Sequence, residues 1–215
     1  MPTSQILLVR HGQTEFNTRG IYQGQIDSPL TQQGIDQAQA LAPRVHAMHS
    51  CPTLYSSDLG RAQHTAQLIA DPQHHVLAEE PGLRERDYGI FQGLIKTEIH
   101  KLHPAEWTRH RSGDPNYVVP GGESQQQLLE RVVATIGTIA ERHPGELVIA
   151  VTHGGALATF AKHVLGLPVN APRRFDMGNT SISLFTHNDS GHWIVRFFGD
   201  LAHLPDLPAP NQTEG

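Results

Sequence analysis

Short apolar blocks alternate along the chain with longer stretches in which apolar residues recur at helical intervals. The blocks predict strands over about residues 5–10, 53–56, 76–77, 145–151, 181–185 and 193–197. The stretches predict amphipathic helices that begin near residues 31, 59, 124 and 156. Strands that alternate with helices in this way are typical of an α/β protein.

Three local patterns refine the expected arrangement. Residues 145–151 are apolar on both faces, which is typical of a central parallel strand. Residues 181–185 and 193–197 flank Asn188-Asp189-Ser190-Gly191, a turn sequence that predicts an antiparallel hairpin. Ser57-Asp58 is expected to cap the helix that follows it. We therefore expect a three-layer αβα fold with a mostly parallel central sheet and an antiparallel edge hairpin.

Residues 83–122 depart from the regular alternation. They form short helical stretches broken by Gly and Pro, and we interpret them as a small helical insertion that covers a site on the sheet. We expect residues 1–215 to form a single domain, with a Pro-rich flexible tail over residues 205–215.

Composition and charge narrow the class of protein. Hydrophobic residues make up 38% of the chain and charged residues 17%, which argues against a disordered protein. The net charge of -5, without a basic block, argues against nucleic acid as the main partner. The apolar run 6–9 is too short for a signal peptide or a membrane span. Cys51 is the single cysteine and cannot form an internal disulfide, so we predict a cytoplasmic protein that does not bind membranes.

Candidate chemistry begins where the first predicted strand ends, at Arg10-His11-Gly12. In α/β sheets, ligand sites gather at the carboxyl ends of the strands. The guanidinium of Arg10 suits phosphate oxygens, and His11 can act as a nucleophile near neutral pH. Gly12 is expected to let the backbone pass close to a ligand. These residues together predict phosphate chemistry at a histidine.

Four further segments carry matching chemistry: Ser56-Ser57-Asp58-Leu59-Gly60-Arg61-Ala62; Leu83-Arg84-Glu85-Arg86-Asp87-Tyr88-Gly89; Val151-Thr152-His153-Gly154; and Asn17 with Gln23-Gly24. They supply a second arginine, an acid, a second histidine at a strand end, and polar donors in the first loop. His100 and His103 are three residues apart, but no third ligand accompanies them, so we interpret them as surface histidines and predict no metal site.

At these residues the sequence resembles the histidine phosphatase superfamily, also called the phosphoglycerate mutase-like family. The shared motifs are Arg-His-Gly, the first-loop Asn, Ser-Ser-Asp-Leu-x-Arg-Ala, a Glu followed by Tyr-Gly, Pro-Gly-Gly-Glu-Ser and the late His-Gly. They occur in the family's order and spacing, and they cover nearly the whole chain.

The resemblance implies a role for each matching residue. His11 would attack the phosphoryl group and become a phosphohistidine, while Arg10, Arg61 and His153 surround the phosphoryl oxygens. Glu85 would protonate the leaving oxygen. The expected substrate-binding residues are Asn17, Thr14, Gln23, Gly24, Tyr88, Lys96, Arg109, Arg111 and Gly154. The Pro120-Gly121-Gly122-Glu123-Ser124 segment is expected to be a turn and a helix start, from which Glu123 could face the pocket.

The same core serves two outcomes, and the sequence bears on both. Tyr88, Lys96 and the Trp107-Thr108-Arg109-His110-Arg111 segment match the mutase pattern, whereas the missing long insertion and Gly155 favour a phosphatase. We predict a metal-independent phosphatase of small phosphorylated metabolites that needs no cofactor. The alternative is a 2,3-bisphosphoglycerate-dependent phosphoglycerate mutase, in which 2,3-bisphosphoglycerate primes the enzyme. A non-catalytic phosphoester-binding module is disfavoured because both histidines, both arginines and the acid are present.

The sequence leaves the physiological substrate open. It also leaves open the oligomeric state, a homodimer included, and the role of the C-terminal segment with His203.

Overall fold

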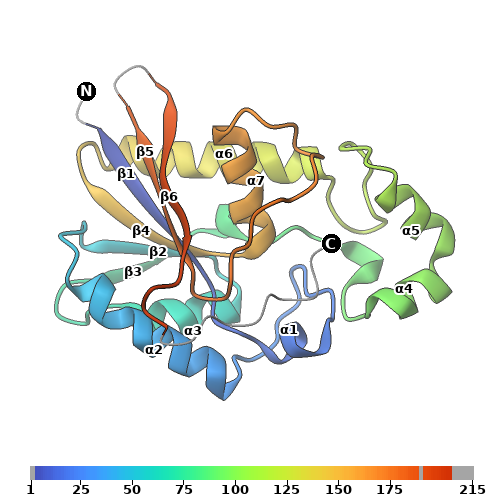
Figure 1. Cartoon of the computed structure of the whole chain (residues 1–215), viewed down its shortest axis with the longest axis horizontal. Helices are drawn as coiled ribbons and strands as arrows, with labels where there is room; N and C mark the ends of the chain where they lie inside the picture. The colour runs from blue at the N-terminus through green and yellow to red at the C-terminus, as the bar shows by residue number, and fades with distance from the viewer. Residues whose placement is uncertain (1–2, 189–190, 205–215) are drawn as a thin grey trace.

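The computed structural model describes residues 3–188 and 191–204, and a six-stranded sheet runs through its centre (Figure 1). The strands are β1 (Ser4–Arg10), β2 (Thr53–Ser56), β3 (Val76–Glu79), β4 (Leu147–Thr152), β5 (Ile182–His187) and β6 (Trp193–Asp200). Their order is β3-β2-β4-β1-β5-β6. Strands β3, β2, β4 and β1 are parallel to one another. Strand β5 is antiparallel to both of its neighbours, β1 and β6. The predicted parallel sheet with an antiparallel edge hairpin is confirmed.

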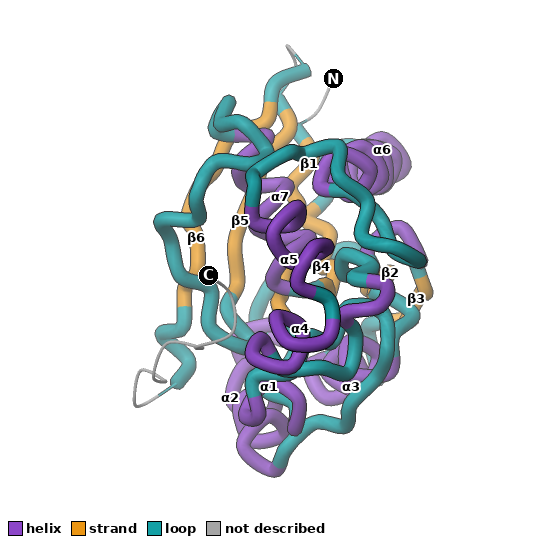
Figure 2. The backbone as a smooth tube through the Cα atoms, turned by 90° about the vertical axis from the view of Figure 1, so that its right-hand side faces the viewer, coloured by secondary structure: helices purple, strands orange, loops and turns teal. Residues whose placement is uncertain are grey.

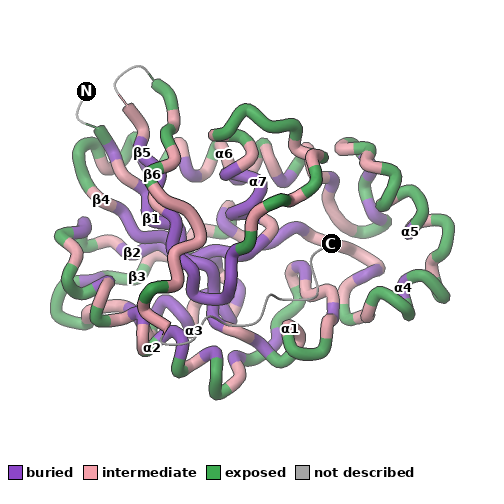
Figure 3. Tube along the Cα trace, viewed as in Figure 1, coloured by how far each residue is buried: buried purple, intermediate pink, exposed green. Residues whose placement is uncertain are grey.

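Helices cover both faces of the sheet, as the three-layer prediction requires. Helices α2 (Gln32–His46) and α3 (Gly60–Ile69) pack with Leu7 and Val9 of β1. Helices α6 (Gln125–Arg142) and α7 (Gly154–Val164) pack with Ile6 and Leu8. Successive side chains of a strand point to opposite faces, so one apolar run supplies both cores. Figure 3 shows these central strands buried.

The insertion predicted between residues 83 and 122 is a separate group of small elements beyond the strand ends (Figures 1 and 2). It contains the short helices η2 (Gly89–Phe91), α4 (Lys96–Leu102) and α5 (Pro104–Arg111), and the short helix η1 (Pro81–Leu83) precedes it. The group has its own apolar cluster, formed by Phe91, Ile99, Trp107, Tyr117 and Val119. This cluster lets α4 and α5 keep their shape although their outer surfaces are exposed (Figure 3).

The register of the strands determines where the site forms. Arg10 of β1 pairs with Thr152 of β4, and Ser56 of β2 pairs with Val151. The three strands therefore end at nearly the same level, and the residues that directly follow them lie along one edge of the sheet.

Two local predictions near this edge need correction. Ser57-Asp58 does not cap α3, because the helix begins at Gly60 and its first amides are capped from the first loop. The Asp27 carboxylate accepts hydrogen bonds from the amides of Gly60 (2.6 Å) and Arg61 (3.4 Å). The first loop also contains a helix that was not predicted, α1 (Glu15–Arg19), which Thr14 and Asn17 cap reciprocally.

Two sequence predictions fall on residues outside the described part: the flexible tail over 205–215 and the hairpin tip at 189–190. Within the described ranges, none of the helices is both long enough and apolar enough to cross a bilayer.

Candidate active site

Arg10 and His11 are fixed by hydrogen bonds from both neighbouring strands. The His11 amide donates to the Thr152 carbonyl (3.0 Å), and the Arg10 amide donates to the Ser181 carbonyl (3.0 Å). The Asn179 side chain donates to the His11 carbonyl (2.9 Å). Thr180 donates its amide to the Arg10 carbonyl (3.1 Å) and has a φ of 61°, a strained backbone conformation for a β-branched residue. The segment before β5 therefore holds the end of β1 in place.

The imidazole of His11 is oriented by its own backbone. Its Nδ1 lies 2.7 Å from the carbonyl oxygen of Gly12, and a carbonyl can only accept, so Nδ1 carries the hydrogen. Nε2 then holds the free electron pair. Burial and the charges of Arg61 and Arg10 hold the pKa of His11 well below its usual 6.5. His11 is thus a neutral imidazole with a nucleophilic Nε2 near neutral pH.

Gly12 has a packing role that was not predicted. A Cβ at this position would lie 2.6 Å from the carbonyl oxygen of Gly34 in α2, so the glycine is required by the packing of the loop against the helix. The Gly12 amide donates to Thr65 Oγ1 (2.9 Å), which ties the same turn to α3.

Arg61 lies in the first turn of α3 and is 2% exposed. Its Nη atoms donate to the carbonyls of Gly24 (2.7 Å) and Ile26 (2.9 Å), and Nη1 forms an ion pair with Asp27 (3.2 Å). Within the described residues, its Nε is buried and has no hydrogen-bond partner. A buried donor without a partner on a cationic group is a binding element for an anion.

His153 follows β4, and its ring centroid lies 5.1 Å from that of His11. Its Nε2 is 2.8 Å from Ser57 Oγ, whereas its Nδ1 is buried without a hydrogen-bond partner among the described residues. Burial and the nearby Arg61 and His11 hold the pKa of His153 well below 6.5. Ser57, which was expected to cap a helix, instead orients this imidazole.

Glu85 reaches the site from the start of the insertion. Its carboxylate oxygens accept hydrogen bonds from the amides of Arg86 and Gly155, each at 2.8 Å. A Cβ on Gly155 would lie 2.3 Å from Glu85 Oε1, so this approach requires a glycine at the start of α7. The helix N-terminus also favours the negative charge of the carboxylate.

We considered from the sequence that Glu123 could face the pocket, but Glu123 is not among the residues that line it. Glu123 instead supports the segment that carries Glu85. Its carboxylate pairs with Arg131 (2.5 Å) and accepts from the amide of Asp87 (3.0 Å). Arg131 in turn donates to the carbonyls of Gly82, Arg84 and Glu85. A helix start was predicted at this segment, and Ser124 begins α6 there with a capping box.

These groups surround a cavity of about 250 Å³. The predicted residues that line it are Arg10, His11, Asn17, Gln23, Gly24, Arg61, Glu85, Tyr88 and Arg111. Five other predicted residues do not line it: Thr14, Lys96, Arg109, His153 and Gly154. The rings of His153 and His11 are nonetheless neighbours, and Gly154 is the first residue of α7.

Local contacts explain why Thr14, Lys96 and Arg109 do not line the cavity. Thr14 is fully buried and caps α1. The Lys96 ammonium lies over the Trp107 ring (5.9 Å), and the Arg109 guanidinium lies over the Tyr117 ring (4.7 Å). These stacking contacts direct both cations to the insertion's own cluster. The predicted roles of Thr14, Lys96 and Arg109 in substrate binding are therefore not supported by their positions.

Several lining residues were not predicted. They are Ile21, Tyr22, Arg86, His110, Gln125, Leu128, Gly155, Ala158, Thr159, Lys162, Val169 and Arg173. Arg86 and His110 belong to motif segments that we named from the sequence. Each is next in the sequence to a predicted site residue, Glu85 or Arg111, and could have been predicted from that position. Lys162 and Arg173 belong to no motif.

His203 lies behind the site. Its Nε2 is 3.0 Å from the hydroxyl of Thr180, the residue that holds the Arg10 carbonyl. Burial lowers the pKa of His203 to about 4.

The buried histidines predict a pH dependence of stability. The histidines with a lowered pKa are His11, His75, His110, His153 and His203, and that of His110 falls to about 4. The unfolded chain binds protons at these positions below about pH 6.5, whereas the folded chain does not. The free energy of unfolding should therefore fall as the pH drops from 6.5 towards 4, by at most about 1.4 kcal/mol per histidine and pH unit.

Urea unfolding at a series of pH values measures this slope. His110→Gln should make the slope shallower, and the same change at the exposed His100 should leave it unchanged. Equal slopes in both variants would contradict the assignment of His110 as a partly buried histidine that is neutral in the folded chain.

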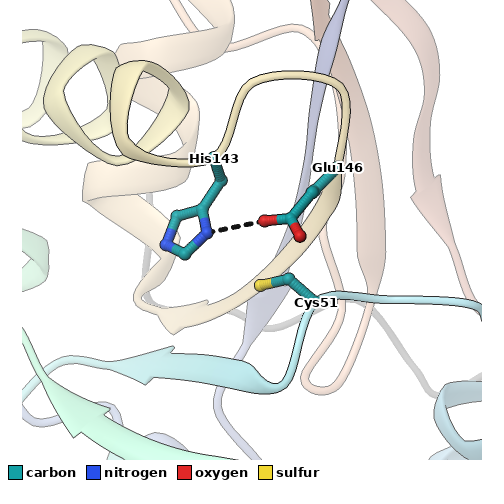
Figure 4. A group of neighbouring side chains, drawn as sticks. All are labelled: Cys51, His143 and Glu146. Carbon is teal, nitrogen blue, oxygen red and sulfur yellow. Dashed lines mark hydrogen bonds and ion pairs between the residues drawn. The ribbon is translucent and has the colours of Figure 1, made fainter.

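One group of described residues has metal-binding side chains close together: Cys51, His143 and Glu146, at the opposite end of the sheet (Figure 4). Their bonds are already satisfied within the protein. His143 Nδ1 pairs with Glu146 (2.8 Å), its Nε2 lies 3.0 Å from the Tyr55 hydroxyl, and Cys51 donates to the Thr53 carbonyl. Burial raises the pKa of the Cys51 thiol, which disfavours the thiolate that a metal needs. We interpret this group as an ion pair with a neighbouring thiol.

Comparison with known proteins gives consistent matches. Residues 6–200 match the sequence pattern of a protein family described as "Histidine phosphatase superfamily (branch 1)". A protein of Cronobacter sakazakii named "Probable phosphoglycerate mutase GpmB" is 37% identical over 217 residues, which cover 98% of this chain and 99% of that protein.

Solved structures match over a similar span. Bacillus stearothermophilus YhfR aligns with a TM-score of 0.84 and 30% identity, over 93% of this chain and 98% of that chain. An Entamoeba histolytica phosphoserine phosphatase mutant, in complex with phosphoserine, aligns with a TM-score of 0.81 and 28% identity, over 94% and 99% of the two chains. Residues 6–200, which match the family, include all those that line the cavity.

Proposed function

Because the chain belongs to the histidine phosphatase superfamily (branch 1), and is an enzyme of that type, we propose that it hydrolyses small phosphomonoesters through a phosphohistidine on His11. The observation that carries this proposal is the orientation of the His11 ring. Its Nδ1 is held by Gly12, so Nε2 is free to attack a phosphoryl group in the cavity that His11 lines.

In the first step, His11 Nε2 forms a bond to phosphorus as the bond from phosphorus to the ester oxygen breaks. Phosphoryl transfer depends on positioning and on stabilising charge at the transferred oxygens. Arg10 and Arg61 bring two fixed positive charges next to His11, and the buried Nε of Arg61 offers a hydrogen bond. His153 can add a further donor through Nδ1 if it takes up a proton.

Glu85 is the proton carrier in this proposal. In the protonated form it would give its proton to the leaving oxygen, because an alkoxide is a poor leaving group. It would then take a proton from the water that attacks the phosphohistidine, which releases phosphate and restores His11. Its place among the lining residues supports this role, and its two backbone hydrogen bonds fix the position of the carboxyl group.

Water as the acceptor is favoured by the space around His11. The cavity volume of about 250 Å³ is well above the roughly 10–15 Å³ that one water molecule requires. The phosphatase named among the similar structures supports the same outcome. A phosphoglycerate mutase is the second candidate, because the curated relatives that are 37% identical carry that name. In that case 2,3-bisphosphoglycerate would prime His11.

The two outcomes differ in a single assay. We expect the purified protein to release inorganic phosphate from a panel of phosphomonoesters that includes phosphoserine, 3-phosphoglycerate and sugar phosphates. The same 3-phosphoglycerate reaction is followed for 2-phosphoglycerate, with and without 2,3-bisphosphoglycerate. Isomerisation without phosphate release would overturn the hydrolase in favour of the mutase.

Metal independence is part of the proposal, since two arginines and a histidine can stabilise the transferred phosphoryl group. The assay is therefore repeated in excess EDTA, where we expect the same rate. Three further predictions stay in place: the protein is cytoplasmic, it forms a single domain, and its partners are small phosphorylated metabolites.

A further inference from the structure

Thr180 has a strained backbone conformation at the point where it contacts the end of β1. Its φ is 61°, and among the described residues it is the only one other than glycine with a positive φ. Its amide donates to the carbonyls of both Arg10 (3.1 Å) and His11 (3.3 Å). A β-branched residue keeps such a conformation only where the surrounding contacts hold it there. The contacts that hold Thr180 therefore also bear on the position of His11.

The side chain of Thr180 is fully buried and has two hydrogen-bond partners. Its Oγ1 lies 2.6 Å from the Asn179 carbonyl oxygen and 3.0 Å from Nε2 of His203. A carbonyl can only accept, so the Thr180 hydroxyl donates to Asn179, and its oxygen accepts a hydrogen bond from His203. Asn179 is the adjacent residue, whereas His203 belongs to a different segment. His203 is thus the contact that fixes the Thr180 side chain from outside its own turn.

The ring of His203 has the form that this hydrogen bond requires. Burial lowers its pKa to about 4, so the imidazole is neutral near pH 7 and carries one hydrogen. That hydrogen lies on Nε2, because the Thr180 oxygen accepts it. Within the described residues the buried Nδ1 has no hydrogen-bond partner, so Thr180 alone receives a hydrogen bond from this ring.

The turn that carries His203 is fastened to the helical layer independently of the site. Asp200, at the end of β6, pairs through both carboxylate oxygens with Arg44 of α2, at 2.7 and 3.2 Å. The same carboxylate accepts from the amide of Ala202 (2.8 Å), and the Leu204 amide donates to the Leu201 carbonyl (2.8 Å). The position of His203 is therefore set by α2 and β6, and Thr180 is held against this fixed point.

We infer that His203 is a positioning residue for the reaction: through Thr180 it holds the Arg10 and His11 carbonyls, and with them Nε2 of His11, where His11 can attack phosphorus. This inference rests on the proposed function, because it takes His11 as the nucleophile. It gives the turn after β6 a part in catalysis, although His203 does not line the cavity.

His203→Leu removes the donor and leaves a side chain that can stay buried. Thr180 can then relax towards an ordinary φ, which would turn its amide away from the Arg10 and His11 carbonyls. We expect kcat/KM to fall by about 10- to 100-fold, because a displacement of about 1 Å at a reacting group can cost about 100-fold. His203→Gln places an amide N–H near the position of Nε2 and should restore most of the activity. His46→Leu, at an exposed histidine of α2, is the matched control and should leave kcat/KM unchanged.

Two anions separate positioning from a general loss of structure, and neither needs turnover. Vanadate binds as a trigonal bipyramid in which Nε2 of the histidine takes one apex, so its affinity depends on where Nε2 lies. Orthophosphate stays tetrahedral and forms no such bond. In His203→Leu we expect vanadate affinity to fall by about tenfold or more and orthophosphate affinity by at most about twofold, because only vanadate resembles the transition state. Calorimetry measures both affinities, and urea unfolding checks that the variant is folded.

Thr180→Gly tests the link between His203 and His11. Glycine adopts a φ near 61° without strain, so the amide at this position should keep its hydrogen bonds without help from His203. We expect Thr180→Gly to retain kcat/KM within about threefold of the wild type. Adding His203→Leu to Thr180→Gly should then cause little further loss.

The outcomes separate this inference from the proposed function. An affinity ratio of vanadate to orthophosphate that is unchanged in His203→Leu would overturn the positioning role. The same holds if His203→Gln restores nothing, or if His203→Leu costs as much in the Thr180→Gly protein as in the wild type. A wild type that does not prefer vanadate would contradict both the inference and a nucleophilic His11. A wild type that prefers vanadate, loses this preference in His203→Leu, and releases no phosphate would contradict the hydrolase alone.

Discussion

A His11→Ala variant should lose essentially all phosphatase activity, by about 10,000-fold or more in kcat. The reason is that Nε2 of His11 supplies the bond to phosphorus, and the neighbouring groups cannot replace it. His153 is turned to Ser57 through its own Nε2, and the arginines are protonated at any working pH. Stopped assays with phosphoserine and 3-phosphoglycerate measure the loss.

Two controls make this result specific. His100→Ala removes an exposed histidine of α4 and should retain wild-type activity. Circular dichroism and urea unfolding should show that His11→Ala is folded, and its ligands should still bind. A folded His11→Ala protein with more than a few per cent of wild-type activity would contradict a nucleophilic role for His11.

A Glu85→Gln variant should slow kcat by about 100- to 10,000-fold with alkyl phosphates. The amide keeps the size of the side chain and can accept a hydrogen bond, but it cannot transfer a proton. The loss of kcat/KM should be much smaller with p-nitrophenyl phosphate, because kcat/KM reports the steps up to release of the leaving group and nitrophenolate leaves without protonation. The measurement is the ratio of kcat/KM for the two kinds of ester, compared between wild type and variant.

Glu130→Gln provides the matched control, since Glu130 is exposed on α6 and lies outside the cavity. If Glu85→Gln lowers kcat/KM equally for both esters, Glu85 has a structural role and another group must give the proton to the leaving oxygen. Gly155→Ala should mimic the loss in part, because its Cβ would displace the Glu85 carboxylate.

The fold could be predicted from the sequence because the spacing of apolar residues indicates each strand and helix separately. The apolar run 6–9 alone indicates a strand buried on both faces, and β1 packs with α2 and α3 on one face and with α6 and α7 on the other. The pairing of Arg10 with Thr152 then brings the two His-Gly motifs together. Strand ends and motifs were therefore enough to predict that Arg10, His11 and His153 meet at one edge of the sheet.

Contacts between distant segments could not be predicted in the same way. Asp27 caps α3 from the first loop, Gly12 is required by the backbone of Gly34, and Thr180 supports the Arg10 carbonyl. Each depends on tertiary packing, which periodicity does not encode. Lys96 and Arg109 were assigned to the site from the motif they follow, but the aromatic rings of the insertion hold them elsewhere.

The central claim is a covalent phosphohistidine on His11, and trapping it is the most direct test. The enzyme is mixed with ³²P-labelled substrate, quenched in alkali within milliseconds, digested, and the labelled peptide is sequenced. We predict label on His11 that survives alkali and is lost in acid, as expected of a nitrogen–phosphorus bond, and no label on His11→Ala. An unlabelled wild-type enzyme during steady turnover of excess substrate, or acid-stable label on another residue, would contradict the account.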